Sequence, residues 1–354
     1  MWPYWLLLAF PAFASLRMPL SKLPRRHLSV LIIVYSVFIG LRFEVGGDWY
    51  VYKDNLEELI GADLVEAVFN PLGDPGYNLL SWLSNGIGAG IYGVNFFCAL
   101  IFSCGLLVFC NVQPRPWLAL CVSTPYLIIV VAMGYTRQSV AIGLALIAFL
   151  YLEKKNIVKF FLGILLATLF HKTALVMLAA ALPVMGDVKG ALKKIIFFLA
   201  TILAAVGLIY TFLAPRLDFF IYGYEQQAMQ SQGAAIRVAM VIIPSLILIF
   251  FQKKFNLQAT QKYLWLGLAY LSVGCAVALF LIKSSTIVDR LALYCIPLQG
   301  FVAARIADTR IFALAPKRLS LAIVMLAFLV QFVWLNFALT AFAWLPYGNI
   351  LLEL

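Results

Sequence analysis

The sequence predicts an all-α, polytopic integral membrane protein with about twelve transmembrane helices of about 20 residues each. Of its 354 residues, 64% are hydrophobic and only 12% are charged, and the mean hydropathy is +0.99. Soluble domains carry about a quarter charged residues, so this composition excludes a water-soluble globule. The apolar runs fill the chain so completely that we treat residues 1–354 as a single transmembrane domain.

The expected spans follow the apolar runs in order. The first run resembles a signal peptide at Ala12-Phe13-Ala14, but its positive charges begin only afterwards, at Arg17, so we keep it as an uncleaved span. The spans are 2–16, 28–41, 91–109, 117–133, 138–152, 157–170, 173–185, 194–213, 237–251, 263–282, 288–304 and 319–343.

The loop charges predict the orientation. With the N-terminus outside, most of the 26 Lys and Arg residues lie in cytoplasmic loops, so the net charge of +11 records topology and not nucleic-acid binding. The cations left outside need another explanation, because a charge near the hydrocarbon is costly unless it is paired or hydrated. A converging group of them would suit an anionic lipid head group such as a pyrophosphate. They are Arg42, Lys53, Arg137, Lys172, Arg216, Arg237, Lys283 and Arg290.

Two outer loops are long. Residues 42–90, after the second span, are rich in carboxylates and aromatic residues and include a short apolar run from Leu79 to Leu83, so we expect a partly folded loop suited to sugars. Residues 214–236 are also polar and aromatic, without the composition of a disordered linker. We expect a second lid or substrate-facing segment there.

The sharpest motif is Arg42-Phe-Glu-Val-Gly-Gly-Asp48-Trp-Tyr-Val-Tyr52. Its Gly46-Gly47 pair allows a tight backbone turn or a close approach to a ligand. The plain alternative is a helix-ending turn in which Arg42 pairs with Glu44 or Asp48 at the membrane interface. Both interpretations stay open on the residues alone.

Three further motifs carry charge at expected outer helix ends. Arg137-Gln138 opens one span, where a snorkelling arginine is the commoner role. His171-Lys172 lies at a turn; the histidine is either a satisfied interfacial residue or a neutral proton acceptor whose pKa the lysine lowers. Asp289-Arg290 precedes Tyr294 by one turn, and Asp289 is also a candidate helix cap. Arg237 allows the same two interpretations as Arg137.

Other chemistries lack their residues. The sequence has no Walker loop, no GxGxxG after a strand and no GxSxG, and its two histidines without cysteine pairing exclude a zinc site. The six cysteines fall within or beside apolar runs, so we expect buried free thiols.

Taken in order, the motifs resemble the EpsG-type branch of the Wzy polysaccharide polymerases, which make O-antigen and capsule in bacteria. The resemblance covers residues 42–347, and one departure is Asp74, where a glutamate is expected. The segments that carry it are Arg42…Gly47-Asp48…Tyr52, Pro75-Gly76-Tyr77, Arg137-Gln138…Ala141, His171-Lys-Thr-Ala174, Asp289-Arg290…Tyr294 and Trp344-Leu-Pro-Tyr347.

The resemblance implies a GT-C-like glycosyltransferase of the bacterial inner membrane, with its active site on the periplasmic face. It would transfer a growing glycan from undecaprenyl pyrophosphate to the sugar of an incoming lipid-linked repeat unit. The resemblance also implies that no metal cofactor is needed, and a chain-length co-polymerase is a candidate partner. The alternatives are an O-antigen ligase-type transferase and a flippase for lipid-linked oligosaccharide.

The expected roles follow from this reaction. Arg137 and Arg290 would stabilise charge on the leaving pyrophosphate, and His171 or Asp48 would accept the proton of the acceptor hydroxyl. The remaining residues would bind the pyrophosphate and sugar. They are Arg42, Gly47, Tyr52, Tyr77, Gln138, Lys172, Arg237, Asp289 and Tyr294.

Overall fold

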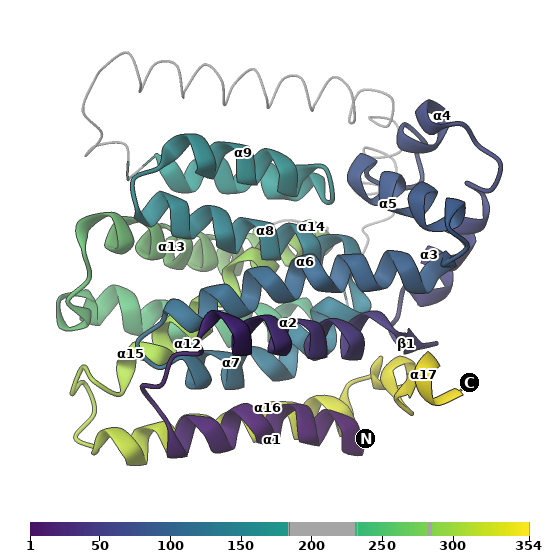
Figure 1. Cartoon of the computed structure of the whole chain (residues 1–354). Helices are drawn as coiled ribbons and strands as arrows, with labels where there is room; N and C mark the ends of the chain where they lie inside the picture. The colour runs from purple at the N-terminus through teal and green to yellow at the C-terminus, as the bar shows by residue number, and fades with distance from the viewer. Residues whose placement is uncertain (183, 185–230, 232, 282–284, 354) are drawn as a thin grey trace. The chain divides into compact units, whose positions relative to one another are not determined.

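The computed structural model describes residues 1–182, 184, 231, 233–281 and 285–353 (Figure 1). The described chain is helical apart from one two-residue antiparallel ladder, so the all-α prediction is confirmed. The chain divides into two compact units. The first unit comprises Met1–Ile147, Leu169–His171 and Ala303–Leu354, and the second comprises Ala148–Thr168 and Lys172–Val302.

The first unit begins with α1 (Trp2–Arg17) and α2 (Arg25–Gly40) and ends with α16 (Pro316–Phe337), which lies beside α1. Between them the chain forms an outer segment and a second set of long helices. These elements are β1 (Arg42–Phe43), α3 (Trp49–Glu57), α4 (Leu64–Val68), α5 (Pro75–Gly86), α6 (Gly90–Val112), α7 (Pro116–Ser123), the π-helix η1 (Thr124–Ala132) and α8 (Thr136–Glu153). Three short elements follow α16, namely η9 (Ala341–Trp344), β2 (Gly348–Asn349) and α17 (Ile350–Glu353).

The second unit contains a run of helices whose described members start at α9 (Ile157–Thr168) and the 3₁₀-helix η2 (Lys172–Ala181). The unit boundary falls inside α8 and inside α15 (Pro297–Ile306). The other described helices are α12 (Ala234–Phe251), η7 (Gln252–Phe255), α13 (Ala259–Leu281), α14 (Ser285–Ala292) and η8 (Leu293–Cys295).

Six stretches of the described chain are long and apolar enough to cross a membrane: Gly90–Val112, Thr136–Glu153, Ala234–Phe255, Ala259–Leu281, Ser285–Ile306 and Pro316–Phe337. A helix suits this environment because it satisfies its own backbone hydrogen bonds. The expected spans 2–16, 28–41, 117–133, 157–170 and 173–185 correspond to shorter apolar helices. The expected span 194–213 and most of the outer loop 214–236 lie outside the described residues. A total of about twelve spans therefore stays a prediction.

Small residues bring the helices of the first unit close together. A methyl group added at Gly40 of α2 would lie 2.5 Å from the Cα of Phe96 in α6. One added at Gly105 of α6 would lie 2.1 Å from the carbonyl oxygen of Gly143 in α8. Glycine at these crossings lets the backbones touch, as in other membrane helix pairs. These two crossings hold α2 against α6 and α6 against α8.

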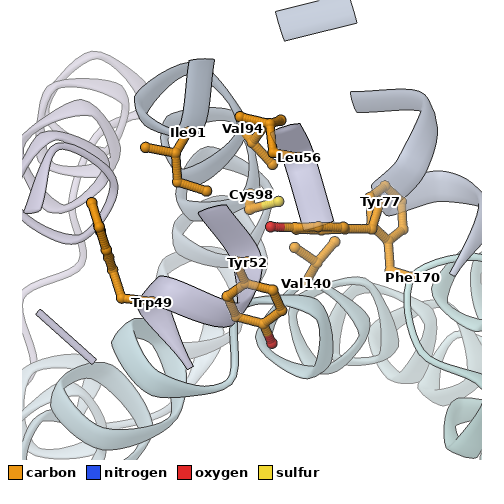
Figure 2. Packing of buried hydrophobic residues seen from close by; sticks show 9 residues of the cluster. All are labelled: Trp49, Tyr52, Leu56, Tyr77, Ile91, Val94, Cys98, Val140 and Phe170. Atoms are coloured by element: carbon orange, nitrogen blue, oxygen red, sulfur yellow. The ribbon is translucent and has the colours of Figure 1, made fainter. Parts of the chain in front are cut away.

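Residues 42–90, expected as a partly folded outer loop, contain the helices α3, α4 and α5. Helices α3 and α5 pack aromatic side chains against α6 and α8 in a buried cluster (Figure 2). The apolar run from Leu79 to Leu83 lies within α5. The cluster consists of Trp49, Tyr52, Leu56, Tyr77, Ile91, Val94, Cys98, Val140 and Phe170.

Two residues expected in cytoplasmic loops form a defined pair. Arg115 donates from Nε and Nη2 to the two carboxylate oxygens of Asp308, at 3.0 and 2.6 Å. Arg305 donates to Gln113 at 2.6 Å nearby. These cations therefore join the loop after α6 to the loop after α15. The prediction for the cysteines is correct for five of them, but Cys104 of α6 is exposed.

Candidate functional site

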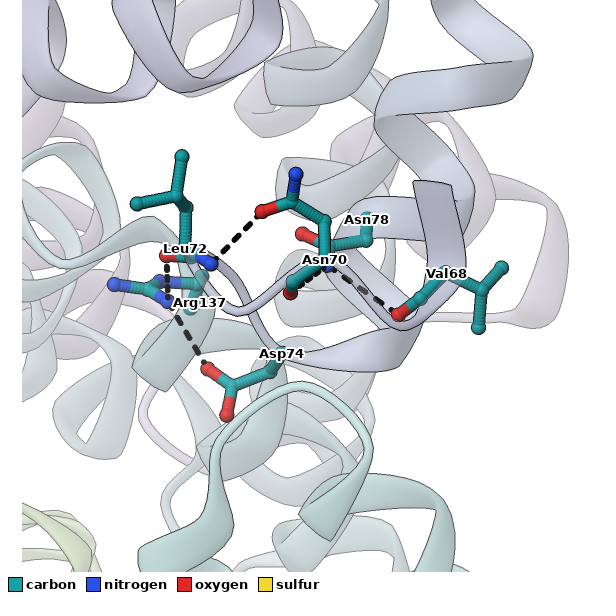
Figure 3. Close-up of polar contacts among 6 residues, drawn as sticks. All are labelled: Val68, Asn70, Leu72, Asp74, Asn78 and Arg137. Atoms are coloured by element: carbon teal, nitrogen blue, oxygen red, sulfur yellow. Dashed lines mark hydrogen bonds and ion pairs between the residues drawn. The ribbon is translucent and has the colours of Figure 1, made fainter. Parts of the chain in front are cut away.

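Arg137 opens α8, and its guanidinium is held in place by two kinds of contact. Its Nη1 donates to the carboxylate of Asp74 at 3.2 Å and reaches the carbonyl oxygen of Leu72 at 3.5 Å (Figure 3). The guanidinium carbon also lies 5.6 Å from the ring centre of Tyr52 and 5.9 Å from that of Tyr77. Its side chain is 26% exposed. A fixed and still accessible arginine is suited to binding an anion.

The loop that presents Asp74 is held by local side-chain hydrogen bonds (Figure 3). Asn78 of α5 donates to the carbonyl oxygen of Asn70 at 2.9 Å, and the side chain of Asn70 accepts from the backbone of Leu72 at 2.9 Å. Asp74 directly precedes Pro75, the first residue of α5, where a proline fits because its missing N–H has no intrahelical partner there. The carboxylate of Asp74 is consequently held beside Arg137 and remains 16% exposed.

Tyr77 lies beneath Arg137 and is buried. Its hydroxyl has no hydrogen-bond partner among the described residues. Burial raises the pKa of Tyr77 well above its ordinary value, so the hydroxyl keeps its proton and is a donor. Unsatisfied buried polar groups are uncommon in native proteins. The substrate contact of Tyr77 stays a prediction.

Arg42 lies at the same end of the first unit but is fully buried, with 0% exposure. It donates to the carbonyl oxygens of Ile39 and Val45, at 2.8 and 2.9 Å, and to the side chains of Asn95 and Thr136, at 3.4 and 2.8 Å. Burial lowers its pKa.

The alternative ion pair of Arg42 with Glu44 or Asp48 is not formed among the described residues. Arg42 instead joins the end of α2 to α6 and to Thr136, the neighbour of Arg137. This geometry favours a positioning role for Arg42, and its contact with pyrophosphate stays a prediction.

The two glycines between Arg42 and Asp48 have different roles. Gly46 has φ of +112°, and a methyl group added to it would lie 2.2 Å from the carbonyl oxygen of Met133. At Gly47 the nearest atom to an added methyl would be 3.7 Å away, an ordinary contact with Trp344. Gly46 is therefore required by packing, whereas Gly47 leaves open the close approach to a ligand that the sequence predicts.

This difference gives a test of Gly47. We expect Gly46→Ala to prevent normal accumulation of the protein, because its backbone conformation and its contact with Met133 both exclude a side chain. Gly47→Ala should accumulate normally and lower the activity of the site. Membrane accumulation and melting temperature in detergent measure the first effect, and the turnover of the purified protein measures the second. Normal turnover of Gly47→Ala would remove Gly47 from the substrate site.

His171 belongs to a short turn that packs on α5. The backbone N–H of Gly76 donates to the carbonyl oxygen of Leu169 at 2.8 Å, and Phe170 enters the aromatic cluster with Tyr77. His171 itself is buried. Residues 169–171 therefore lie against the Pro75-Gly76-Tyr77 motif, although the two segments are far apart in sequence. Both segments belong to the first unit.

The second unit contains its own buried ion pair. Arg237 of α12 pairs through Nε and Nη2 with both carboxylate oxygens of Asp289 in α14, the latter at 2.6 Å. The hydroxyl of Ser231 donates to Asp289 at 2.8 Å. Because α14 begins at Ser285, Asp289 lies in its second turn and does not cap the helix, so the capping interpretation is wrong.

Two further motifs meet in this second unit. The hydroxyl of Thr173, in η2, donates to the hydroxyl of buried Tyr294 at 3.4 Å. The helical turn after His171 is thereby joined to the Asp289-Arg290…Tyr294 motif. Arg290 lies in the last turn of α14, partly exposed, and Lys172 begins η2, also partly exposed.

The predicted site residues therefore form two groups. Arg42, Gly47, Asp48, Tyr52, Tyr77, Arg137, Gln138 and His171 belong to the first unit, and Lys172, Arg237, Asp289, Arg290 and Tyr294 belong to the second. No three His, Cys, Asp or Glu side chains in the described chain gather as a metal would require, and metal independence of the reaction stays a prediction.

Sequence reasoning did not assign several partners. Asp74 was noted only as a departure from the family pattern, although its position directly before the Pro-Gly-Tyr segment could have identified it as a site residue. Asn95, Thr136 and Ser231 gave no signal, because an isolated polar residue inside or beside an apolar run identifies no partner.

Comparisons with known proteins agree with these motifs. No curated protein and no solved structure is significantly similar to the chain. The model of one family, described as the EpsG family, matches residues 25–349, which is nearly the whole sequence. The chain therefore belongs to the EpsG family.

Proposed function

We propose that this protein is a membrane glycosyltransferase that polymerises lipid-linked oligosaccharide repeat units of a bacterial polysaccharide. The donor is a glycan on undecaprenyl pyrophosphate, and the acceptor is the non-reducing-end sugar of another lipid-linked unit. Membership of the EpsG family supports polysaccharide synthesis. The observation that carries the reaction type is Arg137, a partly exposed arginine held on two tyrosine rings beside a carboxylate.

The reaction is a single displacement at the anomeric carbon of the donor. The acceptor hydroxyl oxygen forms a bond to that carbon, and the bond from the carbon to the pyrophosphate oxygen breaks. The bonding electrons leave with the pyrophosphate, where Arg137 stabilises the developing charge. Arg290 and Lys172, which belong to the second unit, are proposed as further cations for anionic groups of the substrate. The buried ring of Tyr77 lies beside the guanidinium of Arg137, and its proposed role is to help hold that arginine toward the pyrophosphate.

The acceptor proton passes to a general base, which we propose to be His171 or Asp48. A neutral histidine is well matched to pH 7, whereas a carboxylate is sufficient when bond breaking runs ahead of proton transfer. Asp74 forms an ion pair with Arg137, so its main proposed role is to orient that arginine. The other predicted residues, among them Tyr52 and Gln138, would line the sugar.

We place the active site on the outer face of the inner membrane, with the N-terminus outside. This orientation predicts that Glu58→Cys, in the outer loop, reacts with a membrane-impermeant maleimide in right-side-out vesicles. Lys154→Cys, after α8, should react only in inverted vesicles. Both native side chains are exposed, and exposed Cys104 is replaced by serine in the background. The reverse pattern would move the proposed site to the cytoplasmic face.

The function itself is tested with purified protein in nanodiscs. Undecaprenyl-pyrophosphate-linked repeat units are added in buffer containing EDTA, and the products are separated on a gel. A ladder of products is the expected result and would support metal independence. Transfer only to a lipid-core acceptor would identify a ligase. Movement of the lipid-linked substrate across vesicles without elongation would identify a flippase.

A further inference from the structure

The last residues of the chain return to the segment that carries Arg42 and Asp48. Strand β2 pairs with β1, so that Arg42 lies opposite Asn349 and Phe43 opposite Gly348. The backbone N–H of Gly46 donates to the carbonyl oxygen of Ala343 at 2.8 Å. We call residues 341–349 the tail segment. It adds backbone hydrogen bonds to a loop that the side chain of Arg42 also holds through the carbonyl oxygen of Val45.

Trp344 is the centre of the tail segment. Its indole N–H donates to the carbonyl oxygen of Ile129 at 2.8 Å, and its own carbonyl accepts from the hydroxyl of Tyr4 at 2.8 Å. Ile129 lies in the π-helix η1, which ends just before α8. Such helices are rare and occur mostly near functional sites. Trp344 therefore joins Tyr4 near the start of the chain, through its backbone, and the segment before α8, through its indole.

The ring of Trp344 also lies against the residues that precede Arg137. A methyl group added at Gly134 would be 2.4 Å from Cζ2 of Trp344, and one added at Gly47 would be 3.7 Å from its ring. Gly134 is three residues before Arg137. The indole thus occupies the space between the Gly46-Gly47 turn and the start of α8.

We infer that Trp344 is a positioning residue for the site on the first unit, which sets Arg137 and the Gly47-Asp48 turn relative to each other. The inference rests on the proposed function. The tail segment contacts both parts of the site and touches neither Arg137 nor Asp74 in any described hydrogen bond. A displacement of about 1 Å in such a scaffold can lower a rate about 100-fold.

The test adds one methyl group beside Trp344 and then makes room for it with a second substitution. Gly134→Ala places a methyl against Trp344, whereas Trp344→Phe removes the ring atoms it would meet. Gly134→Ala should lower kcat by roughly tenfold or more with a smaller change in KM. Trp344→Phe alone should have a milder effect, and the double variant should return to the level of Trp344→Phe. Gly274→Ala in α13 is the control, because a methyl there meets no atom within 4 Å.

A second readout does not depend on activity. A Cβ at Gly348 would lie 3.4 Å from that of Phe43 and 2.9 Å from the carbonyl oxygen of Phe43. After a small backbone shift that relieves the second contact, Phe43→Cys with Gly348→Cys should form a disulfide when Cys104 is replaced by serine. Gly134→Ala should slow this cross-linking, and Trp344→Phe should restore its rate.

Normal kcat in Gly134→Ala, or a double variant whose loss is the product of the two single losses, would overturn the inference. If the wild-type protein forms no polymer, the proposed function fails. The cross-linking rates then still decide whether Trp344 holds the outer turn against the start of α8.

Discussion

Arg137→Ala is expected to lower polymer formation about 100-fold or more, the loss typical of removing a group that stabilises transition-state charge. The protein should still fold, because the side chain is 26% exposed and its ion pair with Asp74 lies at the surface of the site. Arg137→Lys should recover only part of the activity, since lysine keeps the charge but loses the planar group that stacks on Tyr52. Glycan ladders from nanodisc reactions measure both effects.

The control for this prediction is Lys53→Ala. Lys53 is another outer cation, 46% exposed and paired only loosely with Glu57 at 3.9 Å, so its removal should leave polymer formation unchanged. Arg290→Ala tests the same role in the second unit. Near-normal chains from both Arg137→Ala and Arg290→Ala would contradict the proposed pyrophosphate site.

Asp289→Ala is expected to destabilise the protein by about 3–5 kcal/mol, because it leaves buried Arg237 without its carboxylate. The protein should accumulate poorly and melt at a lower temperature in detergent. Asp289→Asn should be less damaging, since the amide oxygen still accepts one hydrogen bond. Thermal melting of purified protein, followed by size-exclusion chromatography, measures the loss.

A double variant separates structure from substrate binding at this pair. Arg237→Met with Asp289→Leu removes both charges together and should recover most of the lost stability. Polymer formation should stay low if Arg237 contacts the pyrophosphate, as the sequence predicts. Full recovery of polymer would restrict Arg237 to a structural role. If the double variant does not regain stability, apolar packing cannot replace the ion pair of Arg237 with Asp289 and the hydrogen bond from Ser231 to Asp289.

The sequence alone determined the class of protein and the position of its candidate site. Composition required helices in a membrane, because an apolar chain in lipid must satisfy its backbone hydrogen bonds internally. Arginines at the expected outer helix ends, such as Arg137, were identified because a charge beside hydrocarbon raises the free energy unless it is paired or hydrated. The ordered motifs predicted the EpsG family, and the match over residues 25–349 confirmed it.

The tertiary structure decided which residues meet. Asp74 and Arg137 are separated by 63 positions, and Gly46 and Ala343 lie near opposite ends of the chain. Neither contact can be predicted from a periodic pattern in the sequence. A contact between distant segments depends on how helices such as α6 and α8 cross. That crossing is fixed by glycines whose role is visible only once the neighbouring backbone is placed. The sequence thus identifies the charged candidate residues from their local context, whereas the packing of the helices decides which residues they contact.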